Sequence, residues 1–275
     1  MSDNDIPSTE KQSNYDNLDE MGIGELLENI NREDQKIAEV VAGIIPEIEK
    51  FVTALVDRML KGGRLFYIGA GTSGRLGILD ASEIPPTYGA DPGFIVGIIA
   101  GGDAAIRSAI EGAEDDKEQA WADLEKYQPA KNDTILGIAA SGRTPYVIGG
   151  LETAATHGLL TGCITCNKDA PVTKVAQISM VAEVGPEFVT GSTRMKAGTA
   201  QKLILNMIST TAMIKLGKVQ GNKMVDMQLS NEKLVERGIR MIREELHEIS
   251  PEDAKELLLT TGSVRKAILA YHQRR

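Results

Sequence analysis

Five short apolar segments that alternate with helix-like segments constrain this chain more than any other feature of its sequence. The apolar segments are residues 65–68, 94–99, 134–139, 160–165 and 178–184. Continuous apolar runs of this length are typical of strands covered on both faces, and strands that alternate with helices form parallel sheets. The sequence therefore predicts an α/β fold: a three-layer αβα sandwich around a five-stranded, doubly wound parallel sheet.

Helical spacing of apolar residues predicts the remaining elements. Between the strands we expect helices at 75–82, 104–127, 146–157 and 171–176, and a long helix follows at about 195–216. One short and one long helix are expected within 23–60, ended by two glycines at 62 and 63. Residues 1–20 have the composition of a flexible tail, 21–230 form the sheet domain, and 231–275 are predicted to be a small helical domain. Ser250 followed by proline and two acids is a good helix start within that domain.

Charge and hydropathy exclude several classes of protein. The 275 residues carry a net charge of −9, which argues against binding to a nucleic-acid backbone. No apolar stretch is long enough to cross a membrane, and the polar N-terminus has no signal segment, so we expect a cytoplasmic protein. Cys163 and Cys166 form a Cys-x-x-Cys pattern inside a predicted strand. Positions three apart on a strand face opposite sides, so buried core thiols are favoured over a redox pair.

The first predicted strand runs into Gly-Ala-Gly-Thr-Ser-Gly at residues 69–74, named here the first phosphate loop. Glycines let backbone N–H groups approach an anion, and the following helix adds its positive N-terminal end. The letters also match the dinucleotide motif Gly-x-Gly-x-x-Gly, which needs an acidic residue about 20 positions later to hold a ribose. The nearest carboxylate after the second strand is Asp103, which comes too late. The hydroxyls of Thr72 and Ser73 suit a phosphate monoester instead.

The third predicted strand runs into a second loop of the same kind, Ala-Ser-Gly-Arg-Thr-Pro at residues 140–145, named here the second phosphate loop. Ser141 and Thr144 can donate to phosphate oxygens, Gly142 keeps the backbone open, and Arg143 can pair with the phosphate. The alternative is that Ser141 and Thr144 only cap the next helix, and the residues alone favour neither interpretation. Two hydroxyl-rich loops at strand ends of one sheet favour a sugar phosphate as the ligand.

Two groups of carboxylates are candidates for acid–base chemistry. Glu83 ends the helix that follows the first phosphate loop, among apolar or small residues, so we expect partial burial and a raised pKa. Glu111 and Glu114 are expected to share one face of the predicted helix 104–127, where a solvated surface is the simpler interpretation of Glu114. The three histidines are scattered without metal-ligand spacing, so no metal site is predicted.

Four blocks, residues 63–86, 137–146, 189–202 and 217–226, closely resemble the bacterial N-acetylmuramic acid 6-phosphate etherase family. With their spacing they cover roughly residues 18–240. The resemblance implies the sugar isomerase (SIS) fold and a homodimer with its site near the interface. It also implies cofactor-free cleavage of the ether between D-lactate and the sugar, giving N-acetylglucosamine 6-phosphate in cell-wall recycling.

The resemblance also assigns roles to residues. By motif, the family's two acid–base glutamates fall on Glu83 and Glu114, which raises Glu114 above the solvated-surface interpretation. Glu111 joins the two loops as a candidate for substrate binding; the loop candidates are Thr72, Ser73, Ser141, Gly142, Arg143 and Thr144. Ile84 stands where cysteine is common in the family. The sequence leaves open what Arg194, Lys196 and Lys202 contact.

Three other functions compete with the etherase. An aldose–ketose isomerase of the same fold would share both loops but not the Ala-Ser-Glu-Ile-Pro-Pro stretch at 81–86. A sugar-phosphate sensor like the glucokinase regulatory protein carries two SIS domains, whereas this chain has room for one. A dinucleotide enzyme is weakened by the missing ribose acid.

Overall fold

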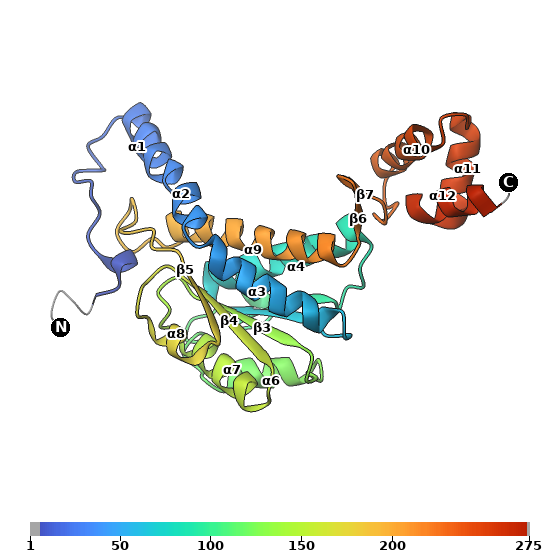
Figure 1. Ribbon diagram of the computed structural model, residues 1–275. Coiled ribbons are helices and arrows are strands. Elements are labelled where there is room, and N and C mark those ends of the chain that lie inside the picture. The colour runs from blue at the N-terminus through green and yellow to red at the C-terminus, as the bar shows by residue number, and fades with distance from the viewer. Residues whose placement is uncertain (1–5, 274–275) are drawn as a thin grey trace. The chain divides into compact units, whose positions relative to one another are not determined.

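The computed structural model describes residues 6–273, and its centre is the predicted five-stranded parallel sheet (Figure 1). The strands are β1 (Leu65–Gly69), β2 (Ile95–Ile99), β3 (Thr134–Ile138), β4 (Leu160–Thr165) and β5 (Ile178–Val181), and their spatial order is β2-β1-β3-β4-β5. The α/β prediction is confirmed. Gly69, the last residue of β1, lies opposite Ile138, the last residue of β3. The two phosphate loops therefore leave neighbouring strands at the same edge, at the point where the chain changes direction across the sheet.

Helices cover both faces of the sheet. On one face lie α6 (Gln119–Glu125), α7 (Pro145–Thr156) and α8 (Pro171–Val175); on the other lie α3 (Ile45–Met59), α4 (Gly71–Tyr88) and α9 (Lys196–Lys215) (Figure 1). All residues of β1, β3 and β4 are buried. Phe66, Ile135 and Leu151 belong to one apolar cluster between the sheet and α7. This burial on both faces explains why the strands read as continuous apolar runs.

The helices differ from their predicted extents in three places. Residues 23–60 hold three helices rather than two: α1 (Ile23–Gln35), α2 (Ile37–Ala42) and α3. Helix α4 begins at Gly71 and continues through Pro85 and Pro86 to Tyr88, although prolines disfavour a helix interior. Ile84 and Tyr88 are both buried, so packing of the last turns offsets the backbone hydrogen bonds that proline cannot make. The predicted helix 104–127 is divided into α5 (Ala104–Arg107) and α6, with turns over 111–115 between them.

The segment before α1 (Ile23–Gln35) and α2 (Ile37–Ala42) makes specific contacts, unlike the flexible tail expected for it. A short 3-10 helix, η2 (Ser8–Glu10), contains Thr9, which is fully buried. Ser8 and Thr9 bond to the side chain of Asn167. Further along, the Ser13 hydroxyl donates to the carbonyl of Phe188 at 2.7 Å. These bonds hold the described part of the segment against the sheet domain.

The chain divides into two compact units. The first holds the described residues through Ala81 together with Gly93–Ala212, and the second holds Ser82–Pro92 with the described residues from Met213. The second unit contains the hairpin β6 (Val219–Gln220) and β7 (Lys223–Met224) and the helices α10 (Glu232–Leu246), α11 (Pro251–Thr261) and α12 (Val264–Gln273). It begins before the predicted residue 231 because Val225 and Met227 pack into the core of α10–α12. Ser250 caps α11 as predicted, accepting the Asp253 N–H at 3.0 Å. No helix within residues 6–273 combines the length and apolar character needed to span a membrane.

Candidate active site

The first phosphate loop leads directly into α4, which begins at Gly71. The N–H groups of the first helical turn have no partner within a helix, so they face outward as anion donors. Gly74 is required by packing: a Cβ there would lie 2.5 Å from Ile99 Cγ1 and 2.8 Å from the Gly69 carbonyl oxygen. This close contact between α4 and the strand ends holds the N-terminus of α4 at the carboxyl edge of the sheet.

A cavity of about 240 Å³ opens beside this loop. Its lining includes the loop residues Ala70 and Gly71, the Arg75 side chain from α4, and both Glu111 and Glu114. The structure thus brings the second carboxylate group to the first phosphate loop, although some 40 residues separate them in the chain.

Glu111 and Glu114 reach the cavity from a turn. The expectation that they share a helix face is wrong, because residues 111–115 are turns and Gly112 has a φ of +73°. Glycine alone adopts this left-handed backbone freely, so the predicted helix is interrupted here. The Glu114 carbonyl accepts the Tyr146 N–H at 3.0 Å, which ties the turn to α7 just after the second phosphate loop. Both glutamate side chains are exposed in the single chain.

Arg75 is a cavity residue to which sequence reasoning gave no role. Its Nε donates to the Ile106 carbonyl at 2.9 Å, so the guanidinium joins α4 to α5 beside the two glutamates. A fixed cation next to two carboxylates offsets their repulsion of an anionic substrate. The sequence could have indicated this role, because Arg75 directly follows Gly74, the last glycine of the first phosphate loop.

Close packing and hydrogen bonds fix the backbone of the second phosphate loop. Gly142 has a φ of +67°, and a Cβ there would lie 2.5 Å from the Ala170 Cβ. The Ala140 carbonyl accepts bonds from Thr165 Oγ1 at 3.2 Å and from Asn167 Nδ2 at 2.8 Å. Thr144 is the N-cap residue of α7 but makes no side-chain cap bond there within the described chain, so capping does not occupy its hydroxyl.

The other loop hydroxyls have defined surroundings. Ser141 Oγ accepts the Arg143 N–H at 3.2 Å. Thr72 is half-buried beside Gly198 at the start of α9, where a Cβ would lie 3.5 Å from Thr72 Cγ2. Ser73 is buried and donates to Gln201 Oε1 of α9 at 2.9 Å.

Glu83 does not have the surroundings expected from its neighbours. The expectation of a partly buried carboxyl is wrong for the single chain, because the Glu83 side chain is exposed while Ile84 beside it is buried. A helix turns its residues to different sides, so small and apolar neighbours in sequence do not enclose a side chain that points outward. One turn earlier, Asp80 is buried and accepts bonds from Tyr67, Asn206 and Ser209.

Lys196, whose contacts the sequence left open, belongs to a buried network. Its Nζ lies 2.7 Å from Glu33 Oε2 of α1, and both side chains are at least 96% buried. Burial opposes ionisation of Glu33, but hydrogen bonds from Lys196, Lys36 and Tyr15 outweigh it and lower its pKa to about 2. Glu187 accepts the N–H groups of Lys196 and Ala197 at the start of α9, while burial raises its pKa. Lys196 therefore anchors α9.

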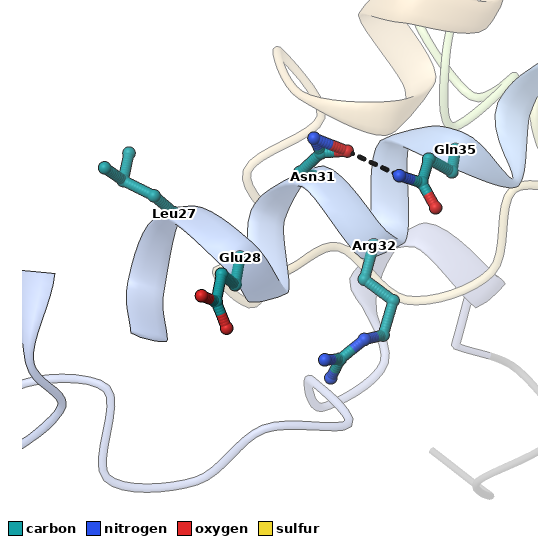
Figure 2. A pocket seen from close by; sticks show the side chains of 5 residues that line it. All are labelled: Leu27, Glu28, Asn31, Arg32 and Gln35. Carbon is teal, nitrogen blue, oxygen red and sulfur yellow. Dashed lines mark hydrogen bonds between the residues drawn. The ribbon is translucent and has the colours of Figure 1, made fainter. Parts of the chain in front are cut away.

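A larger hollow of about 470 Å³ lies along one side of α1 (Figure 2). It is lined by Leu27, Glu28, Asn31, Arg32 and Gln35, all from this helix, and Gln35 Nε2 donates to Asn31 Oδ1 at 2.9 Å. Neither phosphate loop contributes to it. Of these two cavities, the smaller one is lined by the first phosphate loop together with Glu111 and Glu114.

Comparison with known proteins gives relatives over the whole chain. A sequence profile described as the glucokinase regulatory protein N-terminal SIS domain matches residues 47–155, which contain both phosphate loops and all three candidate glutamates. A protein of Christiangramia forsetii named N-acetylmuramic acid 6-phosphate etherase is 61% identical over 98% of each chain. One of the same name from Bacteroides thetaiotaomicron is 59% identical over 98% of this chain and 96% of its own.

Solved structures share the fold. A putative phosphosugar isomerase involved in capsule formation from Bacteroides fragilis aligns with a TM-score of 0.54 at 22% identity, over 72% of this chain and 94% of its own. A putative sugar-phosphate isomerase from Listeria monocytogenes gives a TM-score of 0.52 at 16% identity, over 72% and 93% of the two chains. At these identities the likeness concerns the fold alone.

Proposed function

This chain belongs to the N-acetylmuramic acid 6-phosphate etherase family, and from that premise we propose that it cleaves the D-lactyl ether of N-acetylmuramic acid 6-phosphate. The products are N-acetylglucosamine 6-phosphate and D-lactate, which makes the protein a carbon–oxygen lyase of cell-wall amino-sugar recycling. The observation that carries the proposal is the cavity that Glu114 shares with the first phosphate loop.

The two phosphate loops bind the 6-phosphate in this proposal. The N–H groups at the start of α4 and the hydroxyls of Thr72, Ser73, Ser141 and Thr144 supply donors, and the loops leave adjacent strands at one edge. Holding the sugar by the end remote from the ether lets binding energy orient the reacting carbons. Glu111 contacts the substrate from the cavity wall.

An unactivated ether resists direct hydrolysis at neutral pH, so the reaction proceeds by elimination and addition. Ring opening turns C1 into an aldehyde, which makes the C2 proton acidic. A carboxylate removes that proton, the C3–O bond breaks, and the leaving oxygen takes a proton to become lactate. Water then adds at C3, and C2 regains a proton. A carboxylate pair can perform these steps, each transfer contributing roughly 10²–10⁴ in rate.

We assign the C2 proton to Glu114, because its side chain lines the cavity beside the loop. Glu83 protonates the leaving lactate and later activates water. Both side chains are exposed in the single chain, so the proposal includes a homodimer in which a second copy covers the site. An exposed apolar side chain in the cavity wall supports a covering copy, because Ile110 is 44% exposed.

The test separates the two roles by isotope exchange in deuterated water. Glu83→Gln should release no lactate from N-acetylmuramic acid 6-phosphate but still exchange the C2 hydrogen, whereas Glu114→Gln should lose both. Glu118→Gln is the matched control, since Glu118 is exposed near Glu114 and does not line the cavity. Loss of exchange in Glu83→Gln would reverse the assignment, and absence of lactate release by the unaltered protein would refute the function.

The dimer and the compartment are tested separately. Light scattering at assay concentration should give twice the chain mass, and a fully active monomer contradicts the covering copy. The proposed compartment is the cytoplasm, and activity found only in an extracytoplasmic fraction of the host cell contradicts it.

A further inference from the structure

One buried side chain beside the first phosphate loop carries a donor without a hydrogen-bond partner. Gln201 of α9 is 1% exposed, and its Nε2 bonds to no group among residues 6–273. Its other terminal atom, Oε1, accepts the Ser73 hydroxyl at 2.9 Å. An unpaired buried N–H group costs about 1–3 kcal/mol, so native proteins rarely keep one without a reason.

The direction of the hydrogen bond from Ser73 to Gln201 conflicts with phosphate binding by the Ser73 hydroxyl. A serine hydroxyl has a single proton, and here Ser73 directs it to Gln201. In that arrangement the Ser73 hydroxyl can offer only lone pairs to a phosphate, which also carries only acceptors. Either the Ser73 hydroxyl does not bind the anion or the arrangement changes when the anion arrives.

A half rotation of the Gln201 side-chain amide removes both the unpaired N–H group and the conflict at the Ser73 hydroxyl. It exchanges Oε1 and Nε2 with almost no change in shape, because the terminal torsion of glutamine is broad and twofold. Nε2 then donates to Ser73 Oγ, and the Ser73 proton becomes available to the ligand. The atom left without a partner is now a carbonyl oxygen, which proteins tolerate more readily than an unpaired N–H. A bound anion supplies an acceptor for the Ser73 proton in this arrangement.

We propose that Gln201 is a positioning residue whose amide turns when phosphate binds and makes Ser73 a donor to the 6-phosphate. The inference rests on the proposed function, in which the first phosphate loop holds the phosphate. Gln201 does not touch the substrate; it acts through Ser73. Its ligand class is a phosphate monoester, because that group offers only acceptors to the hydroxyl.

The experiment measures the affinity of the full chain for N-acetylglucosamine 6-phosphate by calorimetry. The variants are Ser73→Ala, Gln201→Met and the double variant. The matched control is Ser209→Ala, which removes another buried bond between α9 and α4, the 3.1 Å bond from Ser209 to Asp80, away from the loop. Gln201→Met should weaken binding about tenfold, the contribution of one charge-assisted bond, and Ser209→Ala should leave it within about twofold.

Two further readouts separate positioning from a structural role. The double variant should bind no more weakly than Ser73→Ala, since Gln201 acts only through that hydroxyl. In turnover, Gln201→Met should raise KM with kcat within about twofold, because phosphate binding is shared by ground and transition states. Should Gln201→Met not fold, Gln201→Asn replaces it, since its amide is one methylene too short to reach Ser73, and the same loss is expected.

The outcomes distinguish this inference from the proposed function. Unchanged affinity in Ser73→Ala contradicts phosphate binding by the Ser73 hydroxyl and with it the inference, but leaves the backbone N–H donors of the proposed function untouched. A loss in Ser73→Ala without any in Gln201→Met overturns the inference alone. Additive losses in the double variant also overturn it, because Gln201 would then act by another route.

Discussion

Replacing Glu33 by glutamine should destabilise the first unit strongly, because it removes the partner of a buried cation. The Lys196 side chain is 3% exposed and its Nζ lies 2.7 Å from Glu33 Oε2. Glu187 remains nearby, but its two oxygens already accept backbone N–H groups at the start of α9. Removing one partner of a buried pair costs about 3–5 kcal/mol. We expect about 3 kcal/mol for Glu33→Gln, since Glu187 still offsets part of the charge.

The pH dependence gives an independent magnitude. The pKa of Glu33 falls from 4.5 to about 2 in the folded chain, which corresponds to about 3 kcal/mol of stability. Because the pKa is lowered on folding, this stability is present above pH 4.5 and is lost as pH falls toward 2. About 2 kcal/mol of it should be gone by about pH 3. Glu33→Gln lacks this dependence, so its deficit relative to the unaltered chain should shrink over the same interval.

Urea unfolding followed by tryptophan fluorescence measures the effect. The chain has a single tryptophan, Trp121 in α6, stacked on His157 within the first unit. Its signal therefore reports that unit, whichever way the second unit unfolds. Titrations at pH 7, 5, 4 and 3 give the difference in unfolding free energy at each pH.

Lys36 provides the matched control, because it binds the same carboxylate from the surface. Its side chain is 55% exposed, and exposed ion pairs contribute about 0–1 kcal/mol. Lys36→Met should therefore cost less than about 1 kcal/mol. If Glu33→Gln costs no more than Lys36→Met at pH 7, or if its deficit is the same at pH 3, the argument from the buried pair is refuted.

Three further outcomes follow from the structure. Gly142→Ala should weaken N-acetylglucosamine 6-phosphate binding at least about tenfold, because φ is +67° and the new Cβ would lie 2.5 Å from the Ala170 Cβ. An unchanged affinity in calorimetry would contradict this prediction. Asn167→Ala should cost about 2 kcal/mol in urea unfolding, because the Ala140 carbonyl and the N-terminal segment lose bonds to a buried amide; a cost under about 0.5 kcal/mol would argue against that role. Cys163 and Cys166 should react with a disulfide reagent only on unfolding, since burial raises their pKa values to about 11 and 12; rapid labelling of the native chain at pH 7 would show the burial to be wrong.

The local sequence was sufficient to predict the structure where backbone conformation and burial depend on residues that are neighbours in the chain. The five strands were predictable because apolar runs such as 65–68 and 160–165 need cover on both faces, and the structure buries them fully. Cys163 and Cys166 are free and buried as predicted, although Cys166 lies one residue past the end of β4. A helix after the first phosphate loop was expected, although α4 begins at Gly71, four residues before the predicted start at 75.

Sequence reasoning failed where tertiary contacts outweighed local preference. The helix after the first phosphate loop was predicted to end at residue 82, but burial of Ile84 and Tyr88 carries α4 past Pro85 and Pro86. Glu83 has apolar neighbours in sequence yet is exposed, because neighbours along a helix point to different sides. The break at Gly112 turned an expected helix face into a turn lining the cavity.

The sequence by itself determined the sheet, the two phosphate loops and the family, because glycine freedom, apolar runs and distinctive blocks are properties of short segments. Only the tertiary structure decided that Glu114 shares a cavity with Gly71, that Lys196 anchors α9 through Glu33, and that Gln201 faces Ser73. Each of these pairs joins positions some 40 to 160 residues apart. Their contact depends on how strands and helices pack in space, and that packing leaves no mark in the local spacing of residues.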